Sequence, residues 1–290
     1  MQSPASSGAR VISIASGKGG VGKTSISVNL AAALSARGVR VILVDGDFGL
    51  ANADLLCGVR VGAHLGHVID GTRSIDEALV TTNAGFRLAP GASGLATLLQ
   101  APASQRIQVV DQLKAIENSC DVILIDCGAG MGQGVRAFLA AADFALIVTT
   151  PEPTSIADAY ALIKSMAVTA TGCGLTTPSP RLLVNMCQDE RDARGAHQRI
   201  ADVAQRFIGL DVRMAGWLPR DSAVASAVRA RSPFYVRAPH CDASKAVGRL
   251  ATGLDRELRL HPVQASHGGG FWRRFFGLSR SNRRGIVNSE

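Results

Sequence analysis

The segment from Gly17 to Thr24 constrains the fold of this chain more than any other feature. It fits the pattern G-x-x-x-x-G-K-[ST], and it lies between an apolar run, Val11–Ala15, and a helical pattern, Ser25–Ala36. Glycines let backbone N–H groups approach phosphate oxygens, and the positive end of the following helix dipole favours anions. We therefore predict a phosphate-binding loop between the first strand and the first helix.

The last two residues of this segment indicate that the bound phosphates belong to a nucleoside triphosphate with Mg²⁺. Lys23 has the position of a lysine that neutralises β- and γ-phosphate charge, and Thr24 that of a hydroxyl that binds Mg²⁺. The alternative is a glycine-rich turn without a ligand, which the flanking strand and helix disfavour. In this segment we expect ATP to contact Gly17, Lys18, Gly19, Gly20, Val21, Gly22, Lys23, Thr24 and Ser25.

Acidic residues follow two apolar strands. Asp45-Gly46-Asp47 comes directly after Val44, and Asp126 follows Val122–Ile125. Ligands bind beyond the carboxyl ends of parallel strands, so these acids should converge on the loop. We predict that Thr24, Asp47 and Asp126 hold the magnesium ion, and that Asp47 also orients the attacking water. The alternative is that these aspartates only cap the helices that follow.

Short apolar strands alternate with helical patterns, which predicts an α/β fold. The sheet should be twisted and mostly parallel, with helices on both faces. We divide the chain into a flexible N-terminus (1–9), a nucleotide-binding domain (10–260), a linker (261–270) and a C-terminal helix (271–284). Further strands are expected at Val39–Val44, Phe144–Val148 and Leu182–Val184, and further helices at Ile156–Val168 and around Ile107, Val110, Leu113 and Ile116.

Composition excludes several classes of protein. A chain with 47% hydrophobic and 19% charged residues is globular rather than disordered. Its six cysteines form no CxxC pair, which disfavours a zinc site or a redox dithiol. No apolar run approaches the roughly 18 residues that a membrane-spanning helix needs, and Met1–Arg10 lacks the pattern of a secretory signal.

The C-terminal segment carries an unusual share of the aromatic and basic residues. On a helical wheel Arg273, Arg280 and Arg284 lie opposite a broad apolar face. A basic amphipathic helix of this kind is typical of proteins that lie on anionic membranes. Docking of the aromatic face on the protein itself or on a partner, and binding to nucleic acid, are the alternatives. The apolar face consists of Phe271, Trp272, Phe275, Phe276 and Leu278.

The string Lys18-Gly19-Gly20-Val21-Gly22-Lys23-Thr24 resembles the deviant Walker A motif of the MinD/ParA ATPases. The resemblance implies a P-loop fold of the SIMIBI type and an ATP-dependent homodimer. In such a dimer Lys18 reaches the nucleotide of the other subunit, so that Lys18, Lys23 and Asp47 are the catalytic residues.

Longer strings resemble one subgroup, the flagellar-number ATPases FlhG and FleN, also called YlxH. They include Asp45–Asn52, Pro90–Gly94, Asp126–Gly130 and Thr149–Lys164, and the resemblance covers roughly residues 10–255. It implies a regulator of flagellar number or placement that works with the SRP-type GTPase FlhF and with flagellar switch or transcription factors. It also implies that Asn185, Pro219 and Arg220 border the adenine.

The sequence departs from the subgroup at two places, and a second function is also compatible with it. Met1–Arg10 does not resemble the DQAxxLR helix that stimulates FlhF, and Cys127 stands where a threonine usually follows the Walker B acid. The second function is a partitioning or division-site ATPase of the ParA or MinD type, with nonspecific DNA as a partner. We expect the protein in the cytoplasm and peripherally on the cytoplasmic face of the inner membrane.

Overall fold

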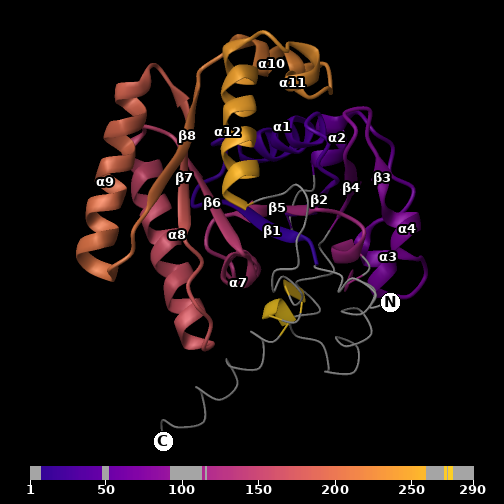
Figure 1. The fold of residues 1–290 in the computed structure, drawn as a ribbon, viewed down its shortest axis with the longest axis horizontal. Helices are drawn as coiled ribbons and strands as arrows, with labels where there is room; N and C mark the ends of the chain where they lie inside the picture. Colours follow the sequence, from indigo (N-terminus) through magenta and orange to yellow (C-terminus); the bar gives the residue numbers. More distant parts are fainter. Residues whose placement is uncertain are drawn as a thin grey trace, which may run out of the picture.

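Among the described residues, eight strands form one sheet. A computed structural model describes residues 8–47, 52–91, 113–114, 116–258, 271–272 and 274–276. The strands are β1 (Arg10–Ser16), β2 (Val41–Gly46), β3 (Val80–Thr81), β4 (Arg87–Ala89), β5 (Val122–Ala129), β6 (Phe144–Thr149), β7 (Pro180–Cys187) and β8 (Arg213–Pro219). Their order is β3-β4-β2-β5-β1-β6-β7-β8 (Figure 1), and only the β3–β4 pair is antiparallel. The predicted, mostly parallel sheet is confirmed.

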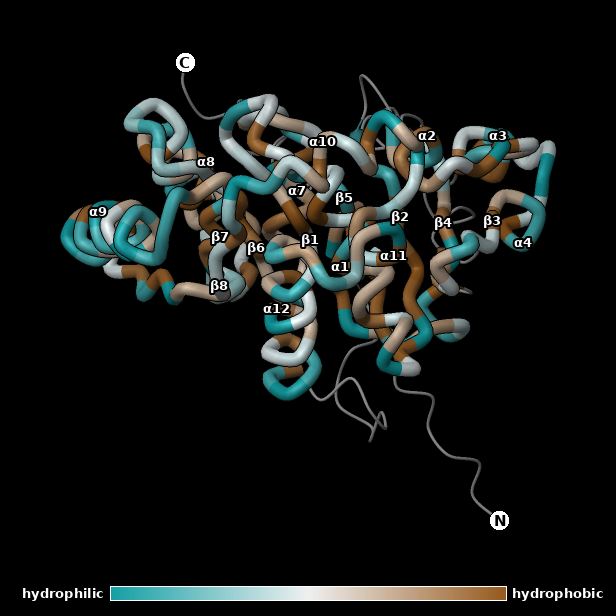
Figure 2. Tube along the Cα trace, turned by 90° about the horizontal axis from the view of Figure 1, so that it is seen from above, coloured by the Kyte–Doolittle hydropathy of each residue, from teal (hydrophilic) through white to brown (hydrophobic). Residues whose placement is uncertain are grey.

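Helices cover both faces of this sheet. The helices are α1 (Lys23–Ser35), α2 (Ala53–Cys57), α3 (Leu65–Ile69), α4 (Ile75–Ala78), α7 (Gln133–Ala141), α8 (Pro153–Gly172), α9 (Glu190–Ile208), α10 (Ser222–Arg229), α11 (Phe234–Arg237) and α12 (Asp242–Leu258). Seen from above, α8 lies on one side of the strands and α12 with α11 on the other (Figure 2). This arrangement leaves the carboxyl ends of the central strands as the edge where a ligand can bind.

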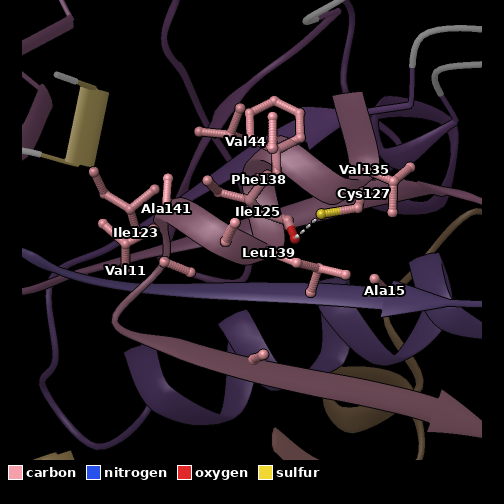
Figure 3. Close-up of a cluster of buried hydrophobic side chains, with 14 of the residues drawn as sticks. Val11, Ala15, Val44, Ile123, Ile125, Cys127, Val135, Phe138, Leu139 and Ala141 are labelled. Carbon is pink, nitrogen blue, oxygen red and sulfur yellow. Dashed lines mark hydrogen bonds between the residues drawn. The ribbon is translucent and has the colours of Figure 1, made fainter. Parts of the chain in front are cut away.

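Successive side chains along each strand point to opposite faces of the sheet, and this divides the core into two clusters. In β1, Val11 and Ala15 pack toward α7 and α8, whereas Ile12 and Ile14 pack toward α1 and α12. Figure 3 shows the first cluster, in which Phe138 of α7 lies among side chains of the central strands. Each fully buried side chain of this size contributes about 1.5–3 kcal/mol, so both faces must stay covered. This explains why the strands read as continuous apolar runs.

The predicted elements lie where expected, and most extend further at one or both ends, although β2 begins at Val41 rather than Val39 and α1 ends at Ser35 rather than Ala36. The strand predicted at Leu182–Val184 runs over Pro180–Cys187, and the helix predicted at Ile156–Val168 over Pro153–Gly172. Asp126 lies inside β5 rather than after it. Residues 1–7, the linker 261–270, residues 277–284 and part of the pattern at 107–116 lie outside the described residues.

The aromatic face of the C-terminal segment is packed against the body of the protein. Phe271, Trp272 and Phe275 are 0% exposed and Phe276 is 5% exposed. The Phe275 ring stacks on Phe138 of α7 with 4.4 Å between centroids, and the segment, yellow in Figure 1, lies beside α7. In the structure, the aromatic face is therefore docked on the protein's own surface, which is one of the alternatives to membrane binding named above. No helix among the described residues is long and apolar enough to cross a membrane.

Arg274 fixes this segment by polar contacts. Its Nε donates to the carbonyl oxygen of Ala141 at 2.8 Å, and its guanidinium pairs with Asp143 at 2.9 Å. Asp143 also accepts a hydrogen bond from the backbone N–H of Val11 in β1. The docked segment is thus tied to both α7 and the central strand.

Candidate nucleotide-binding site

The glycine-rich loop joins β1 to α1 at the carboxyl edge of the sheet. Gly22 caps α1 with a φ of 85°, a left-handed conformation that favours glycine. Gly17 packs so closely on α8 that a side chain there would collide with the backbone carbonyl of Asp158. The loop is therefore held between α1 and α8, and it presents backbone N–H groups at a helix N-terminus.

A buried ion pair lies beneath the loop. Lys23 Nζ donates to Asp126 Oδ1 at 2.8 Å, and these side chains are 6% and 0% exposed. The Ser27 hydroxyl donates to the same oxygen at 2.9 Å. The structure thus brings the loop lysine to the predicted Walker B aspartate. Ser27 was missed in the sequence analysis, although it lies one helical turn after Lys23 and so on the same face of α1.

Asp126 also fits the predicted magnesium ion. Its second oxygen, Oδ2, is buried and has no hydrogen-bond partner among the described residues. A buried carboxylate oxygen without a donor is costly unless something positive or polar meets it, and Mg²⁺ prefers oxygen ligands. The donor set of this edge, a hydroxyl at Thr24 and carboxylates at Asp47 and Asp126, therefore suits the ion.

Asp45 and Asp47, two residues apart, have different surroundings. Asp45 is 1% exposed, and its carboxylate accepts the backbone N–H groups of Asp47 at 3.3 Å and Ala53 at 3.0 Å. It therefore orders the chain on both sides of residues 48–51. Asp47 lies toward β5, since a Cβ atom at Gly128 would be 3.5 Å from its Oδ1. Asp45 is thus occupied by backbone donors, whereas Asp47 lies beside β5.

Burial, together with the negative charge of Asp126 on the neighbouring strand, raises the pKa of Asp45 to about 6, against the backbone hydrogen bonds that lower it. A carboxyl whose pKa is higher in the folded than in the unfolded protein stabilises the fold when it is protonated. For Asp45 this contribution is complete below pH 3.8, the pKa in the unfolded chain, and it is lost as the pH rises through about 6.

We expect Asp45→Asn to change the pH dependence of stability. Relative to the native protein, the variant should gain about 2 kcal/mol in free energy of unfolding between pH 4 and pH 7, because the amide carries no charge to bury. Urea unfolding at both pH values measures this. Parallel pH profiles of the two proteins would contradict the buried, ionising carboxyl.

Lys18 lies at the exposed rim of the loop. Its Nζ is 3.2 Å from Glu152 Oε2 and 3.2 Å from Thr154 Oγ1, at the start of α8. The Lys18 side chain is 42% exposed, and that of Glu152 63%. Exposed pairs of this kind contribute at most about 1 kcal/mol, so Lys18 can change partners at little cost. No pattern in the sequence indicates Glu152 as its partner.

The three residues expected near adenine share one edge of the sheet. Asn185 lies near the carboxyl end of β7, and Pro219 ends the neighbouring strand β8. The Arg220 N–H donates to the carbonyl oxygen of Cys187 at 2.9 Å, which holds the two strand ends together. Asn185 also touches the loop directly, since its Nδ2 donates to the Val21 carbonyl oxygen at 2.8 Å. The structure thus brings Asn185 into direct contact with the phosphate-binding loop.

Cys127 belongs to the core rather than to the site. It is 0% exposed, and it lies among the apolar side chains of Figure 3. Burial raises its pKa to about 12, so the thiol stays neutral at physiological pH. A packing role explains this departure from the usual threonine.

Comparisons with known proteins agree with this geometry. A family model described as an AAA domain matches residues 9–171. The chain is 37% identical over 246 residues to the antiactivator FleN of Pseudomonas aeruginosa, covering 85% of this chain and 86% of that protein. It is 34% identical over 257 residues to the flagellum site-determining protein YlxH of Helicobacter pylori, covering 88% and 85%. Among solved structures, the septum site-determining protein MinD of Pyrococcus horikoshii, complexed with Mg-ADP, superposes with a TM-score of 0.68 at 28% identity, covering 88% of this chain and 100% of that one.

Proposed function

Because this chain belongs to the MinD/ParA family of P-loop ATPases, we propose that it is an ATP-driven dimerisation switch that regulates the number or placement of flagella. One observation carries the proposal. The loop has two lysines with different surroundings, Lys23 buried on Asp126 and Lys18 exposed at the rim. The first serves the subunit's own nucleotide, and the second is free to serve another.

Lys23 acts on the bound phosphates. In the structure its charge is compensated by Asp126. A triphosphate on the loop offers a second anion, so that Lys23 would turn its ammonium toward the phosphates, and Thr24, Asp47 and Asp126 would hold the magnesium ion. When bound, that ion neutralises charge on the phosphate oxygens. Ser27 donates to the same Asp126 oxygen as Lys23, so it would remain a donor to Asp126 when Lys23 turns away.

Lys18 acts across the dimer. Its weak pairing with Glu152 and Thr154 keeps the ammonium at the surface. When two copies meet at their carboxyl strand edges, each Lys18 exchanges these partners for the phosphates of the other subunit. Charge stabilisation of the reaction is then available only after assembly, which couples hydrolysis to dimerisation.

Asp47 orients the attacking water. Its carboxylate lies beside Gly128, and its backbone N–H is fixed by Asp45. We expect Asp47→Ala to lower the rate of ATP hydrolysis by about 100-fold while changing ATP affinity by less than about threefold, because the side chain acts mainly on the water. Phosphate release and equilibrium binding of a fluorescent ATP analogue measure the two effects. An equal loss of both would contradict this role.

The flagellar function rests on the similarity to FleN and YlxH. By that similarity, the partners are an FlhF-type GTPase and flagellar switch or transcription factors. The similarity to MinD supports the second candidate, a site-positioning ATPase that uses the same chemistry. A pull-down with ATP followed by mass spectrometry separates the candidates, since flagellar proteins support the first and division proteins the second.

The C-terminal segment connects this switch to a membrane. In the structure its aromatic side chains are buried against α7, and Arg274 is paired with Asp143. Binding to an anionic membrane therefore requires release of the segment, which frees both the aromatic face and the arginines for lipid. Two released segments on one dimer bind far more tightly than one, so that ATP promotes peripheral attachment to the inner membrane.

A further inference from the structure

Asn185 forms a contact that recognition of a base does not explain. Its side chain is only 9% exposed, and its Nδ2 donates to the carbonyl oxygen of Val21 in the phosphate-binding loop at 2.8 Å. The two residues are 164 positions apart in the sequence. Gly22 next to Val21 has no room for a side chain, since a Cβ atom there would lie 2.6 Å from the same Nδ2. Asn185 therefore packs directly on the Val21–Gly22 peptide.

This peptide has a fixed geometry. A trans peptide bond is planar, and its C=O and N–H groups point in opposite directions. A donor that holds the Val21 carbonyl on the β7 side therefore turns the Gly22 N–H away from β7. In a phosphate-binding loop, inward N–H groups are the donors that phosphate oxygens meet.

The backbone beside Asn185 supports a constrained role. Met186 has a φ of 58°, a left-handed conformation that is uncommon for a residue with a side chain. Such a conformation costs of the order of 1 kcal/mol, and it persists only where the surrounding structure requires it. Here it accompanies an irregular register at the end of β7, and the Met186 Cε atom lies 3.7 Å from the position that a Gly22 Cβ atom would take.

We propose that Asn185 is a positioning residue for the phosphate-binding loop: by holding the Val21 carbonyl it presets the Gly22 N–H toward the phosphates. The proposal rests on the proposed nucleotide binding and deepens it. The Asn185 Oδ1 accepts no hydrogen bond from a described residue, so it can accept from the base while Nδ2 holds the loop. One side chain then couples occupation of the base position to the geometry of the phosphate position.

The test compares the nucleotide-free protein with Asn185→Ala by hydrogen–deuterium exchange. Without the hydrogen bond, the backbone amides of residues 17–24 should exchange at least about tenfold faster, because the loop opens more easily. Affinities for ATP and for inorganic tripolyphosphate, each with Mg²⁺, should fall by a similar factor, although tripolyphosphate has no base. Asn185→Asp, which keeps the shape but loses the donor, should behave in the same way.

Gln188→Ala is the matched control, since it removes an exposed amide three residues further along that forms no hydrogen bond with the described residues of the loop. It should leave exchange and both affinities unchanged. Unchanged exchange over residues 17–24 in both Asn185 variants, or weaker binding of ATP alone, would overturn the proposal. Failure of the native protein to bind Mg-ATP would instead overturn the proposed function.

Discussion

Lys23→Met should abolish ATP-dependent dimerisation and also destabilise the nucleotide-free protein. ATP affinity should fall by about 100-fold or more, because a lysine that is desolvated beside the phosphates is lost. Asp126 would remain 0% exposed without its cation, which costs about 3–5 kcal/mol in free energy of unfolding. Isothermal calorimetry and urea unfolding measure the two effects.

The double variant Lys23→Met/Asp126→Asn separates these effects. It removes the buried charge together with its partner, so stability should recover by most of that amount while ATP affinity stays low. Native stability in the single variant would contradict the buried pair. An ATP-dependent dimer of either variant would contradict the role of Lys23.

Phe275→Ala should lower both stability and membrane binding. The ring is 0% exposed and stacks on Phe138, so its removal should cost about 3–5 kcal/mol, or the whole docking energy of the segment if that is smaller. The same ring is one of the anchors for lipid, so in the ATP-bound dimer, where the segment is released, binding to vesicles that contain phosphatidylglycerol should fall as well. Unfolding curves and vesicle sedimentation measure the two effects.

Asp143→Asn is the control, and it should increase binding to membranes rather than decrease it. It weakens the contact with Arg274 but keeps an oxygen for the N–H of Val11 and leaves the aromatic side chains in place. Loss of a charged hydrogen bond favours release, so binding of the nucleotide-free protein to vesicles should rise by about tenfold. Vesicle binding of Phe275→Ala at the native level would contradict membrane attachment through this face.

The loop and the central strands could be predicted from the sequence because their signals are local. The segment Gly17–Thr24 carries its own spacing, and strands buried on both faces read as continuous apolar runs. Asp126 and Asp47 followed from one rule about the carboxyl ends of parallel strands. These parts of the account needed no knowledge of contacts between distant residues.

The missed parts depend on weaker or distant signals. Strand β8 lies at the edge of the sheet and is mostly half-buried, so it has no continuous apolar run. Helix α9 buries only Ala193, Ala196, Ile200 and Ala204, a stripe of mainly small side chains among many arginines. Asp45 lies near Asp126 and Lys23 as expected, but its burial and its two backbone donors, which make it a structural acceptor, had no signal in the sequence.

Contacts across long stretches of sequence could not be predicted at all. The partners of Lys18 and the hydrogen bond from Asn185 to Val21 join residues more than 130 positions apart. The amphipathic pattern of the C-terminal segment fixed which face is apolar but not what that face touches. Only the fold places α7 beside it.

The most direct test of the central claim is the mass of the protein in solution by light scattering. With Mg²⁺ and a non-hydrolysable ATP analogue, the native protein should have close to twice the 30.2 kDa of one chain, and it should stay monomeric with ADP. Lys18→Ala should stay monomeric with either nucleotide. A native monomer in the ATP analogue, or a Lys18→Ala dimer as stable as the native one, would contradict the account.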